Sequence, residues 1–339
     1  MGKTSISSRA FCGIDVSAAT LAAAVQREDG EGLEQREFAN TAAGHRQLVE
    51  WLRKRGASVR VSLEATGIYS LDAALALDRA DGIEVAVLNP KTVNRFAQTL
   101  RRSKTDKADA AALAEYSLRM PFVAWRRPGP VALALRAIAR HAASLTQDRA
   151  RLGNRLHAAQ GSATVPRCVR QDLRRAMDGL DKRIARLRRE AVAAIRRDAG
   201  LQRKFERLIA MPGIAETSAV QLLAELAGLD PEMTVRQWVA YSGLDPAHQT
   251  SGTSVRKPSR ISRRGNSHLR RALYMPALVG VRCDPHLKAF YRTLQGRHKT
   301  KLQALMAVAR KLLHAIFGIF KTDTPYDGAK LFPQLIPTS

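Results

Sequence analysis

The chain has 339 residues, and its 56 lysines and arginines outnumber 30 aspartates and glutamates, which gives a formal net charge of +26 at pH 7. This length excludes a single small module and allows two or three domains, each with its own core. A positive charge this large predicts a polyanionic partner, and nucleic acid is the first expectation.

Binding to an anionic membrane surface is the competing explanation of the charge. No segment, however, reaches the roughly 18 uninterrupted apolar residues of a membrane span, and residues 1–10 lack the apolar core of a signal peptide. We therefore expect a soluble protein that is not secreted and has no membrane partner. Cys12, Cys168 and Cys283 are too few and too far apart to predict disulfides or a zinc site.

The N-terminal part alternates short apolar runs with helical patterns. The runs at 11–16 and 20–26 are close enough to pair as antiparallel strands, and further runs lie at 36–39, 59–64 and 83–88. The predicted order is three strands, a helix, a strand, a helix, a strand and then helices. This order predicts an α/β layer with parallel crossovers. Ligand sites in such sheets gather at the carboxyl ends of the strands.

Four carboxylates stand out in this part of the chain. Asp15 and Glu64 interrupt or end apolar runs, where a buried carboxylate is costly unless a cation neutralises it. Asp106 and Asp109 follow Thr105, a good N-cap, and so fall on one face of the first helical turn, roughly 5–6 Å apart. These four oxygen donors predict a site for Mg²⁺ or Mn²⁺.

Two simpler explanations of the carboxylates stay open. Acidic residues in the first turn of a helix also complement its dipole. In addition, Lys104 or Lys107 could neutralise the carboxylates in a structural salt bridge.

The composition changes to Ala, Leu and Arg from Pro128 onward, which marks a boundary. Heptad spacing then predicts two long helices around a turn at 161–166, which either fold back as an antiparallel hairpin or pair with another subunit. Their outer arginines suit DNA or RNA phosphates, although any solvated helix can display them. The stretch at 208–229 resembles a helix-hairpin-helix, and a purely structural turn is an equally simple explanation.

A strongly basic segment follows Ser242. Between Asp245 and Asp284 the chain has eight lysines and arginines and no acidic residue, so we expect a phosphate-binding loop and a following helix from about Ser267. Leu302 to Ile316 then carry the apolar stripe of an amphipathic closing helix. The predicted nucleic-acid contacts are Lys104, Lys107, Arg256, Lys257, Arg260, Arg263, Arg264, Arg270 and Arg271.

Several short motifs follow one another along nearly the whole chain. In order, they are Gly13-Ile14-Asp15, Glu64-Ala65-Thr66-Gly67, Asn89-Pro90, Lys104-Thr105-Asp106-Lys107-Ala108-Asp109, Pro212-Gly213-Ile214, Ser251-Gly252, Gly265-Asn266 and Leu269-Arg270-Arg271. In this order they resemble the IS110-type DEDD transposases, a family that includes pilin gene invertases and bridge-RNA-guided serine recombinases. The resemblance runs from about Phe11 to Asp327.

The resemblance implies a division into three regions and a tail. The expected fold class is an α/β, RuvC-like domain of the ribonuclease-H type, an α-helical coiled-coil insertion, and a mainly α C-terminal transposase domain with a helix-hairpin-helix-like segment. The corresponding boundaries are 1–128, 129–205, 206–328 and a tail at 329–339.

The resemblance also implies the chemistry. Asp15, Glu64, Asp106 and Asp109 match the metal-binding tetrad, and Ser251 matches the nucleophilic serine. Ser242 offers a second Ser-Gly pair, and we prefer Ser251 because of its basic surroundings.

The implied enzyme cuts and rejoins donor and target DNA through a phosphoserine intermediate. A non-coding bridge RNA would guide it, and it would act as a homo-oligomer, dimer to tetramer, in the bacterial cytoplasm in association with the nucleoid. A metal-dependent junction nuclease that uses water and a non-catalytic nucleic-acid scaffold are the alternatives.

Overall fold

The computed structural model describes residues 9–28, 32–100, 105–251 and 255–332, and of residues 248–251 and 255–259 it describes the backbone alone. The chain folds into two compact units, Met1–Arg127 and Pro128–Ser339. The first is a mixed α/β unit and the second is mostly helical.

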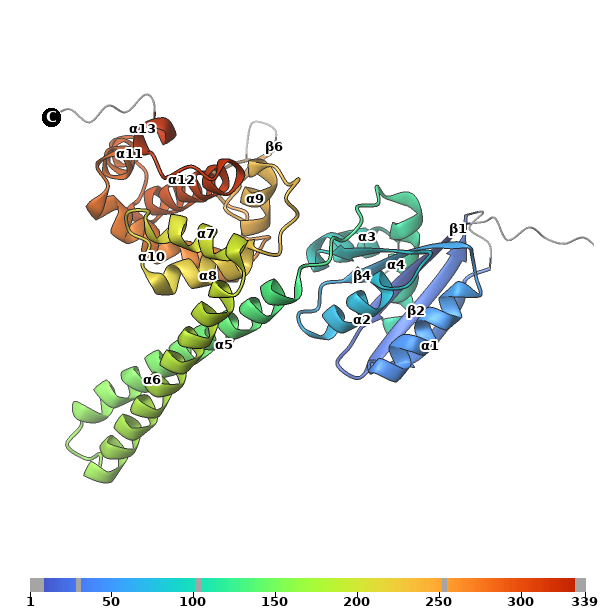
Figure 1. Ribbon diagram of the computed structural model, residues 1–339, viewed down its shortest axis with the longest axis horizontal. Helices are drawn as coiled ribbons and strands as arrows, with labels where there is room; N and C mark the ends of the chain where they lie inside the picture. Colours follow the sequence, from blue (N-terminus) through green and yellow to red (C-terminus); the bar gives the residue numbers. More distant parts are fainter. Residues whose placement is uncertain (1–8, 29–31, 101–104, 252–254, 333–339) are drawn as a thin grey trace, which may run out of the picture. The chain divides into compact units, whose positions relative to one another are not determined.

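A five-stranded sheet of order β3-β2-β1-β4-β5 forms the centre of the first unit (Figure 1). β1, β2 and β3 pair antiparallel, whereas β4 and β5 run parallel to β1. This arrangement confirms the predicted strands and crossovers, and it puts the strand of Asp15 in the middle. The strands are β1 (Arg9–Val16), β2 (Thr20–Arg27), β3 (Glu34–Ala39), β4 (Ser58–Glu64) and β5 (Ile83–Leu88).

The two faces of this sheet pack against different helices. Cys12, Ile14 and Val16 of β1 share a core with α1 (Ala42–Arg53) and α2 (Tyr69–Asp78). The opposite face is lined by small residues, because α4 (Asp106–Arg119) packs directly on β1 and β2 there. α3 (Pro90–Leu100), which we did not anticipate, packs beside α4.

The helix start predicted at Thr105 is confirmed by its cap, and α1 begins with a cap of the same kind. The hydroxyl of Thr105 accepts the N–H of Ala108, and the hydroxyl of Thr41 accepts the N–H of Gly44. Each bond satisfies one of the N–H groups that a helix leaves without an internal partner. Asp106 and Asp109 therefore lie in the first turn of α4, as expected.

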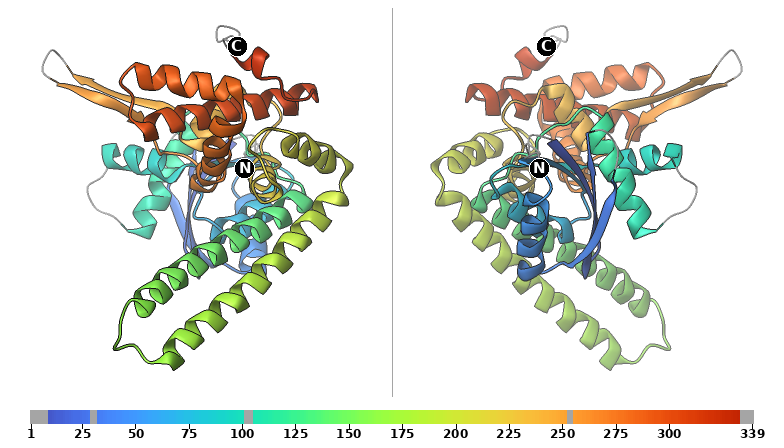
Figure 2. Two further views of the ribbon diagram at one scale, coloured as in Figure 1. Left: turned by 90° about the vertical axis from the view of Figure 1, so that its left-hand side faces the viewer. Right: turned by 90° about the vertical axis from the view of Figure 1, so that its right-hand side faces the viewer.

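In the second unit, α5 (Pro130–Gln160) and α6 (Arg167–Arg196) form an antiparallel hairpin (Figure 2). The heptad pattern therefore closes within one chain, which is the first of the two arrangements we considered. The heptad spacing assigns Arg149 to an interior position, but the residue is part of an exposed ion pair, in which its Nε lies 2.6 Å from Oδ1 of Asp181.

The remaining helices share one core with the near ends of α5 and α6. α12 (Lys301–Thr322) is long and apolar enough to cross a membrane by length and composition. Leu312, Leu313 and Ile316 of this helix are fully buried, as a core helix requires, whereas Leu302, which we assigned to the same stripe, is 57% exposed. The other helices are α7 (Ala199–Ile209), α8 (Glu216–Leu226), α9 (Val235–Ser242), α10 (Ser267–Cys283), α11 (Pro285–Gly296), α12 (Lys301–Thr322) and α13 (Gly328–Leu331).

The turn between α7 and α8 is the segment that resembles a helix-hairpin-helix. Gly213 has φ +87, and a Cβ added to it would lie 2.6 Å from the main-chain nitrogen of Gly280 in α10. The tight turn therefore has a clear packing role within the core of this unit.

The basic segment after Ser242 is a two-stranded ribbon rather than the loop we expected. β6 (Pro246–Ser251) and β7 (Val255–Ile261) pair antiparallel. Backbone hydrogen bonds between the strands satisfy the peptide groups whatever the side chains are, so a polar sequence without apolar alternation can still form this ribbon.

We predict that Gly13→Ala destabilises the first unit. The added Cβ would lie 2.2 Å from main-chain atoms of both Ala110 and Ala114 in α4, so the helix would have to move. Overpacking of this kind lowers the free energy of unfolding by about 1–3 kcal/mol. Denaturant unfolding followed by circular dichroism measures the loss.

Gly179→Ala in α6 is the control, because nothing lies within 4 Å of the Cβ it adds. It should leave stability unchanged or raise it slightly. A Gly13→Ala protein as stable as the unmodified chain would contradict this account of the contact between α4 and β1.

Candidate functional site

Asp15 and Glu64 lie at the carboxyl ends of neighbouring parallel strands. Ile14 pairs with Leu63, so Asp15 and Glu64 are the next residues on β1 and β4. Side chains alternate along a strand, so Asp15 shares with Gly13 the face that α4 covers. The same alternation places Glu64 on that face, and both residues are half-buried.

The direction of α4 brings its first turn to the same edge. Near its C-terminal end, the hydroxyl of Ser117 donates to the carbonyl of Arg60, which lies toward the amino end of β4. The middle of the helix lies over Gly13. Its N-terminal turn, with the exposed Asp106 and the half-buried Asp109, therefore extends toward the carboxyl ends of β1 and β4.

These four carboxylates lie toward one edge of the sheet, but their side chains are not close enough together to form a complete set of metal ligands. Within the described ranges, no three His, Cys, Asp or Glu side chains are close enough to hold a metal ion together. The donor types nevertheless fit a hard divalent cation, which takes carboxylate oxygens. Asp106 is exposed at the start of a helix, where a change of rotamer meets little resistance.

Of the two lysines in the salt-bridge alternative, Lys104 lies outside the described residues. Lys107 is exposed, and its main-chain carbonyl accepts a hydrogen bond from Nε2 of Gln35 at 2.8 Å. This bond ties the first turn of α4 to the edge strand β3.

Asn40 holds the loops of this edge together. Its Nδ2 donates to the carbonyls of Ser17, at 2.9 Å, and of Tyr69, at 3.0 Å. Its Oδ1 lies 2.8 Å from Nε2 of His45, which is the donor because an amide oxygen only accepts. Burial lowers the pKa of His45, and the nearby Asp72 opposes this shift.

In the second unit, close backbone contacts fix the base of the β6–β7 ribbon. Gly243 ends α9 in the left-handed conformation, with φ +65. A Cβ added to Gly265 would lie 2.1 Å from the carbonyl oxygen of Tyr241 and 2.6 Å from the nitrogen of Gly243. Arg263, with φ +54, donates its N–H to the carbonyl of Gly243 at 3.1 Å. The chain segments that enter and leave the ribbon are therefore packed backbone to backbone.

The two candidate serines differ in their surroundings. Ser242 is completely buried, and its hydroxyl donates to the carbonyl of Val239 at 2.7 Å. Ser251 is the last residue of β6 and pairs with Val255, at the far end of a ribbon that extends away from the helices of its unit (Figure 2). Gly252 lies outside the described residues.

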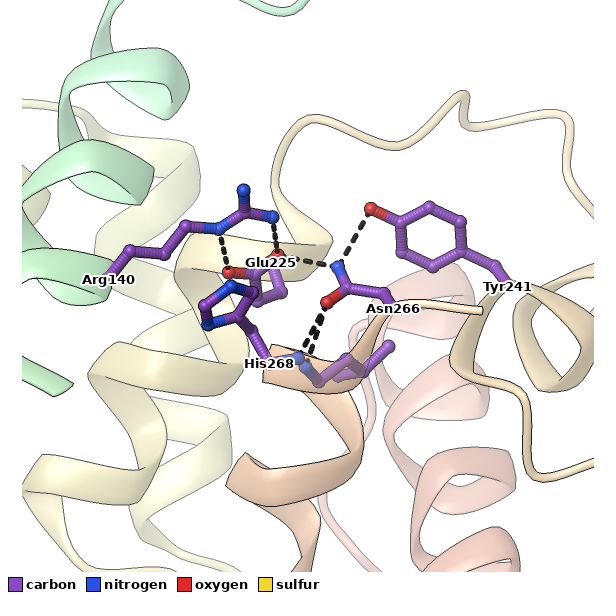
Figure 3. A network of polar contacts seen from close by, with 6 residues as sticks. Arg140, Glu225, Tyr241, Asn266 and His268 are labelled. Atoms are coloured by element: carbon purple, nitrogen blue, oxygen red, sulfur yellow. Dashed lines mark hydrogen bonds and ion pairs between the residues drawn. The ribbon is translucent and has the colours of Figure 1, made fainter. Parts of the chain in front are cut away.

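A buried polar network joins α5, α8, α9 and α10 (Figure 3). Glu225, whose side chain is 3% exposed, accepts hydrogen bonds from Nε and Nη2 of Arg140 at 2.7 and 2.8 Å. It also accepts Nδ2 of Asn266 at 2.6 Å, and that amide lies 3.0 Å from the hydroxyl of Tyr241. The Oδ1 of Asn266 caps α10 by accepting the N–H of His268.

The network sets the charge states of its members. Burial alone would raise the pKa of Glu225, but the hydrogen bonds from Arg140 and Asn266 outweigh it and hold the pKa below its ordinary value. Burial, together with the charge of Arg140, lowers the pKa of His268. Glu225 is therefore a carboxylate at neutral pH, and Arg140 balances its charge.

Two family models match this chain in the regions that contain these features. One, of the transposase domain DEDD_Tnp_IS110, matches residues 12–160. The other, of the transposase IS116/IS110/IS902 family, matches residues 205–292, and together they cover most of the chain. The chain belongs to the IS110 family of transposases.

Relatives of this transposase come from several bacteria. It is 27% identical to the pilin gene-inverting protein of Moraxella bovis, over 86% of this chain and 89% of that protein. It is 24% identical to the insertion element IS116 uncharacterized 44.8 kDa protein of Streptomyces clavuligerus, over 92% and 95% of the two chains. A probable family 20 transposase of Pseudomonas aeruginosa is 33% identical over 46% of each chain. The chain is thus a transposase or site-specific recombinase, and DNA is its substrate.

The predicted nucleic-acid contacts of the transposase fall into three groups. Arg270 is half-buried, and its Nη1 donates to the carbonyls of Ser242 and Gly265, so it holds the base of the ribbon. Burial and the nearby Arg263 lower its pKa. Lys107, Arg260, Arg263, Arg264 and Arg271 are exposed. Lys104, and the side chains of Arg256 and Lys257 on β7, lie outside the described residues.

The Arg140–Glu225 pair was not predicted from the sequence. One signal was present, because Glu225 interrupts the apolar run Leu222–Leu226, where a carboxylate requires a partner. The partner itself could not be found, since Arg140 lies 85 residues away in the chain.

We predict that Glu225→Gln destabilises the second unit at neutral pH. Because Arg140 is 35% exposed and can reach water, the loss should be about 1–3 kcal/mol, below the roughly 3–5 kcal/mol of a fully buried pair. The pKa of Glu225 is lower in the folded protein than its unfolded value of 4.5, so the carboxylate stabilises the fold at pH values above 4.5. That stabilisation is lost as the pH falls through the folded pKa.

Denaturant unfolding at a series of pH values tests this. The unmodified chain should lose more stability on acidification below about pH 4.5 than Glu225→Gln does. Asp181→Asn, which removes an exposed ion pair in the same unit, should have little effect. Equal acid sensitivity of the two proteins would show that Glu225 does not contribute in this way.

Proposed function

We propose that this transposase cuts and rejoins DNA through a phosphoserine intermediate on Ser251, assisted by a divalent cation, Mg²⁺ or Mn²⁺, at Asp15, Glu64, Asp106 and Asp109. The observation that carries the proposal is that β1 and β4 end, and α4 begins, at one edge of the first unit's sheet. The α/β layer of the first unit also supports the proposal of a RuvC-like fold.

The metal site would use one carboxylate from each of two strands and two from one helix. Asp15 and Glu64 are half-buried on a sheet face and would provide the least mobile ligands. Asp106 and Asp109 would turn toward them from the first turn of α4. When bound, the ion would polarise the phosphodiester and help to ionise the attacking hydroxyl.

Ser251 would act as the nucleophile. Its Oγ forms a bond to phosphorus and gives up its proton to a base, while the phosphorus bond to the leaving sugar oxygen breaks and that oxygen takes a proton. One phosphoester bond replaces another, so the reverse reaction rejoins DNA without ATP. The exposed cations Arg260, Arg263 and Arg264 at the base of the ribbon support DNA binding there.

We further propose a guide RNA and an oligomer. The net charge of +26 supports binding of RNA in addition to DNA, and a non-coding bridge RNA would then select the sequences by base pairing. The apolar seam residues Leu152, Leu156 and Met177 remain half-buried in the α5–α6 hairpin, which supports pairing with further copies into a dimer or tetramer.

A junction nuclease that uses water is the second candidate. The position of the carboxylates at the ends of β1 and β4 favours the nuclease, because a metal ion held there could activate water as well as a serine. The requirement for Ser251 distinguishes the two candidates, because the nuclease does not need this residue.

The carboxylates are tested by Asp15→Asn and Asp106→Asn. Each should lower the rate of strand exchange by more than about 100-fold, since even outer-shell partners of metal ligands are worth about 10–100-fold. DNA binding, measured by fluorescence anisotropy, should persist. Asp81→Asn, at an exposed position just before β5 and thus at the opposite edge, is the matched control. Full activity of both variants in metal-free buffer would eliminate the metal site.

The nucleophile is tested with a DNA substrate that is nicked near the crossover, so that a covalent intermediate cannot be resolved. The unmodified chain should form a protein–DNA adduct, and peptide mapping should place it on Ser251. Ser251→Ala should bind DNA but form no adduct, whereas Ser267→Ala, an exposed serine of the same unit, should behave normally. An adduct on Ser242 or Tyr241 would refute the assignment, and normal cleavage by Ser251→Ala would favour the nuclease.

A further inference from the structure

Two large apolar side chains are exposed beside the candidate carboxylate edge. Ile68 is 76% exposed and Tyr69 is 48% exposed, and they are consecutive residues at the start of α2. Only the turn 65–67 separates them from Glu64 at the end of β4. Of the apolar residues that follow them in α2, Ala73, Ala74 and Leu77 are buried in the core, and Leu71, Leu75 and Ala76 are half-buried. Packing therefore explains the rest of this helix but not its first two large residues.

The backbone beneath these two side chains is firmly held. The N–H of Ala65 donates to the carbonyl of Leu88 at 2.9 Å, and the N–H of Thr66 donates to the hydroxyl of Ser70 at 3.2 Å. Nδ2 of Asn40 donates to the carbonyl of Tyr69 at 3.0 Å. The turn thus presents an isoleucine and a tyrosine ring to solvent from a defined backbone, which lowers the entropic cost of a contact.

The charges around the turn indicate what kind of group it suits. Asp72, three residues after Tyr69 in the first turn of α2, is an exposed carboxylate, so a phosphate is disfavoured against the tyrosine ring itself. The face of a nucleobase carries no net charge and stacks on aromatic rings. The exposed cations Lys91 and Arg95 lie on α3, which follows the neighbouring strand β5, and they suit the phosphates that flank such a base.

We propose that Tyr69 stacks on an unpaired base of the DNA strand that is to be exchanged, with Ile68 in contact with the same base or its neighbour. This inference rests on the proposed function, because it makes the turn the element that holds the strand next to the carboxylates. Strand exchange requires bases near the cut to lose their partners, and an exposed aromatic ring compensates for lost stacking without regard to sequence.

Fluorescence of 2-aminopurine tests the proposal directly. The probe is a short single-stranded oligodeoxynucleotide with one central 2-aminopurine, compared with the same strand in a duplex and with an oligoribonucleotide of the same sequence. Binding of the full chain should quench the single-stranded DNA probe and leave the duplex nearly unchanged. Tyr69→Ala should lose the quenching and bind the single strand about 5- to 100-fold more weakly, whereas Tyr69→Phe, which keeps the ring, should retain both.

Tyr274→Ala is the matched control, since Tyr274 is an aromatic residue of α10 that is 38% exposed. It should quench and bind like the unmodified chain. Ile68→Ala should weaken binding less than Tyr69→Ala does. Thermal melting should show that Tyr69→Ala is folded, because only its main-chain carbonyl takes part in the bond from Asn40.

Three results would overturn the proposal. Unchanged quenching in Tyr69→Ala would show that the ring does not contact the base, and quenching of the RNA probe alone would assign the turn to RNA. A change in the oligomeric state of Tyr69→Ala, measured by light scattering, without any change in quenching would make the turn a contact between copies of the chain.

The test is independent of the catalytic chemistry. It is repeated in the Asp106→Asn background and without divalent cations, where no strand can be cut. Quenching that persists there, and that depends on Tyr69, supports the stacking contact even if the metal site proves wrong. Loss of strand exchange in Asp106→Asn together with normal quenching in Tyr69→Ala would retain the metal site and refute the contact.

Discussion

The direct contact between α4 and β1 is the constraint on which the first unit depends. At Gly13 the helix backbone lies so close to the strand that there is no room for a side chain, and the surrounding residues Ala22, Ala24, Ala110 and Ala114 are all small. Contact at this distance fixes both the rotation and the direction of the helix. The first turn of α4 is thereby brought to the edge at which β1 and β4 end, so a packing requirement places the four carboxylates within one region.

The second unit uses a different means to hold its functional segment. The β6–β7 ribbon extends away from the helices of its unit (Figure 2), so its position depends on its base. There, Gly243 and Gly265 allow two backbone segments to touch, and Asn266 connects α10 to the buried carboxylate of Glu225. Arg140 neutralises that carboxylate from α5, so the α5–α6 hairpin and the base of the ribbon share one hydrogen-bonded network. A change in either element is expected to be felt by the other.

Both units combine a rigid support with exposed chemical groups. In the first, Asn40 holds the start of α2, where Ile68 and Tyr69 are exposed, and the sheet supports α4, whose first turn exposes Asp106. In the second, the glycine contacts and Arg270 hold a ribbon whose base exposes Arg263 and Arg264. Function on exposed loops over a fixed scaffold is the usual division in enzymes, because loops tolerate polar and charged residues that a core would not. The four candidate carboxylates lie in the first unit, and most of the predicted nucleic-acid contacts lie in the second.

The sequence by itself determined the elements whose signals are local. Alternation and turn residues identify the five strands of the first unit, Thr41 and Thr105 mark helix starts, and the heptads identify α5 and α6. The motif order also led to the correct family. Local signals suffice here because strand period, helix period and capping depend on residues only a few positions apart.

Only the tertiary structure decided how these elements meet. It closed the heptads within one chain, converted the expected loop after Ser242 into a ribbon, and paired Glu225 with Arg140 across 85 positions. It also exposed Leu302, which the helical spacing places on an apolar stripe, and buried the polar Ser242. Contacts between residues far apart in the chain depend on the packing of whole layers, and for that reason no local pattern could have specified them.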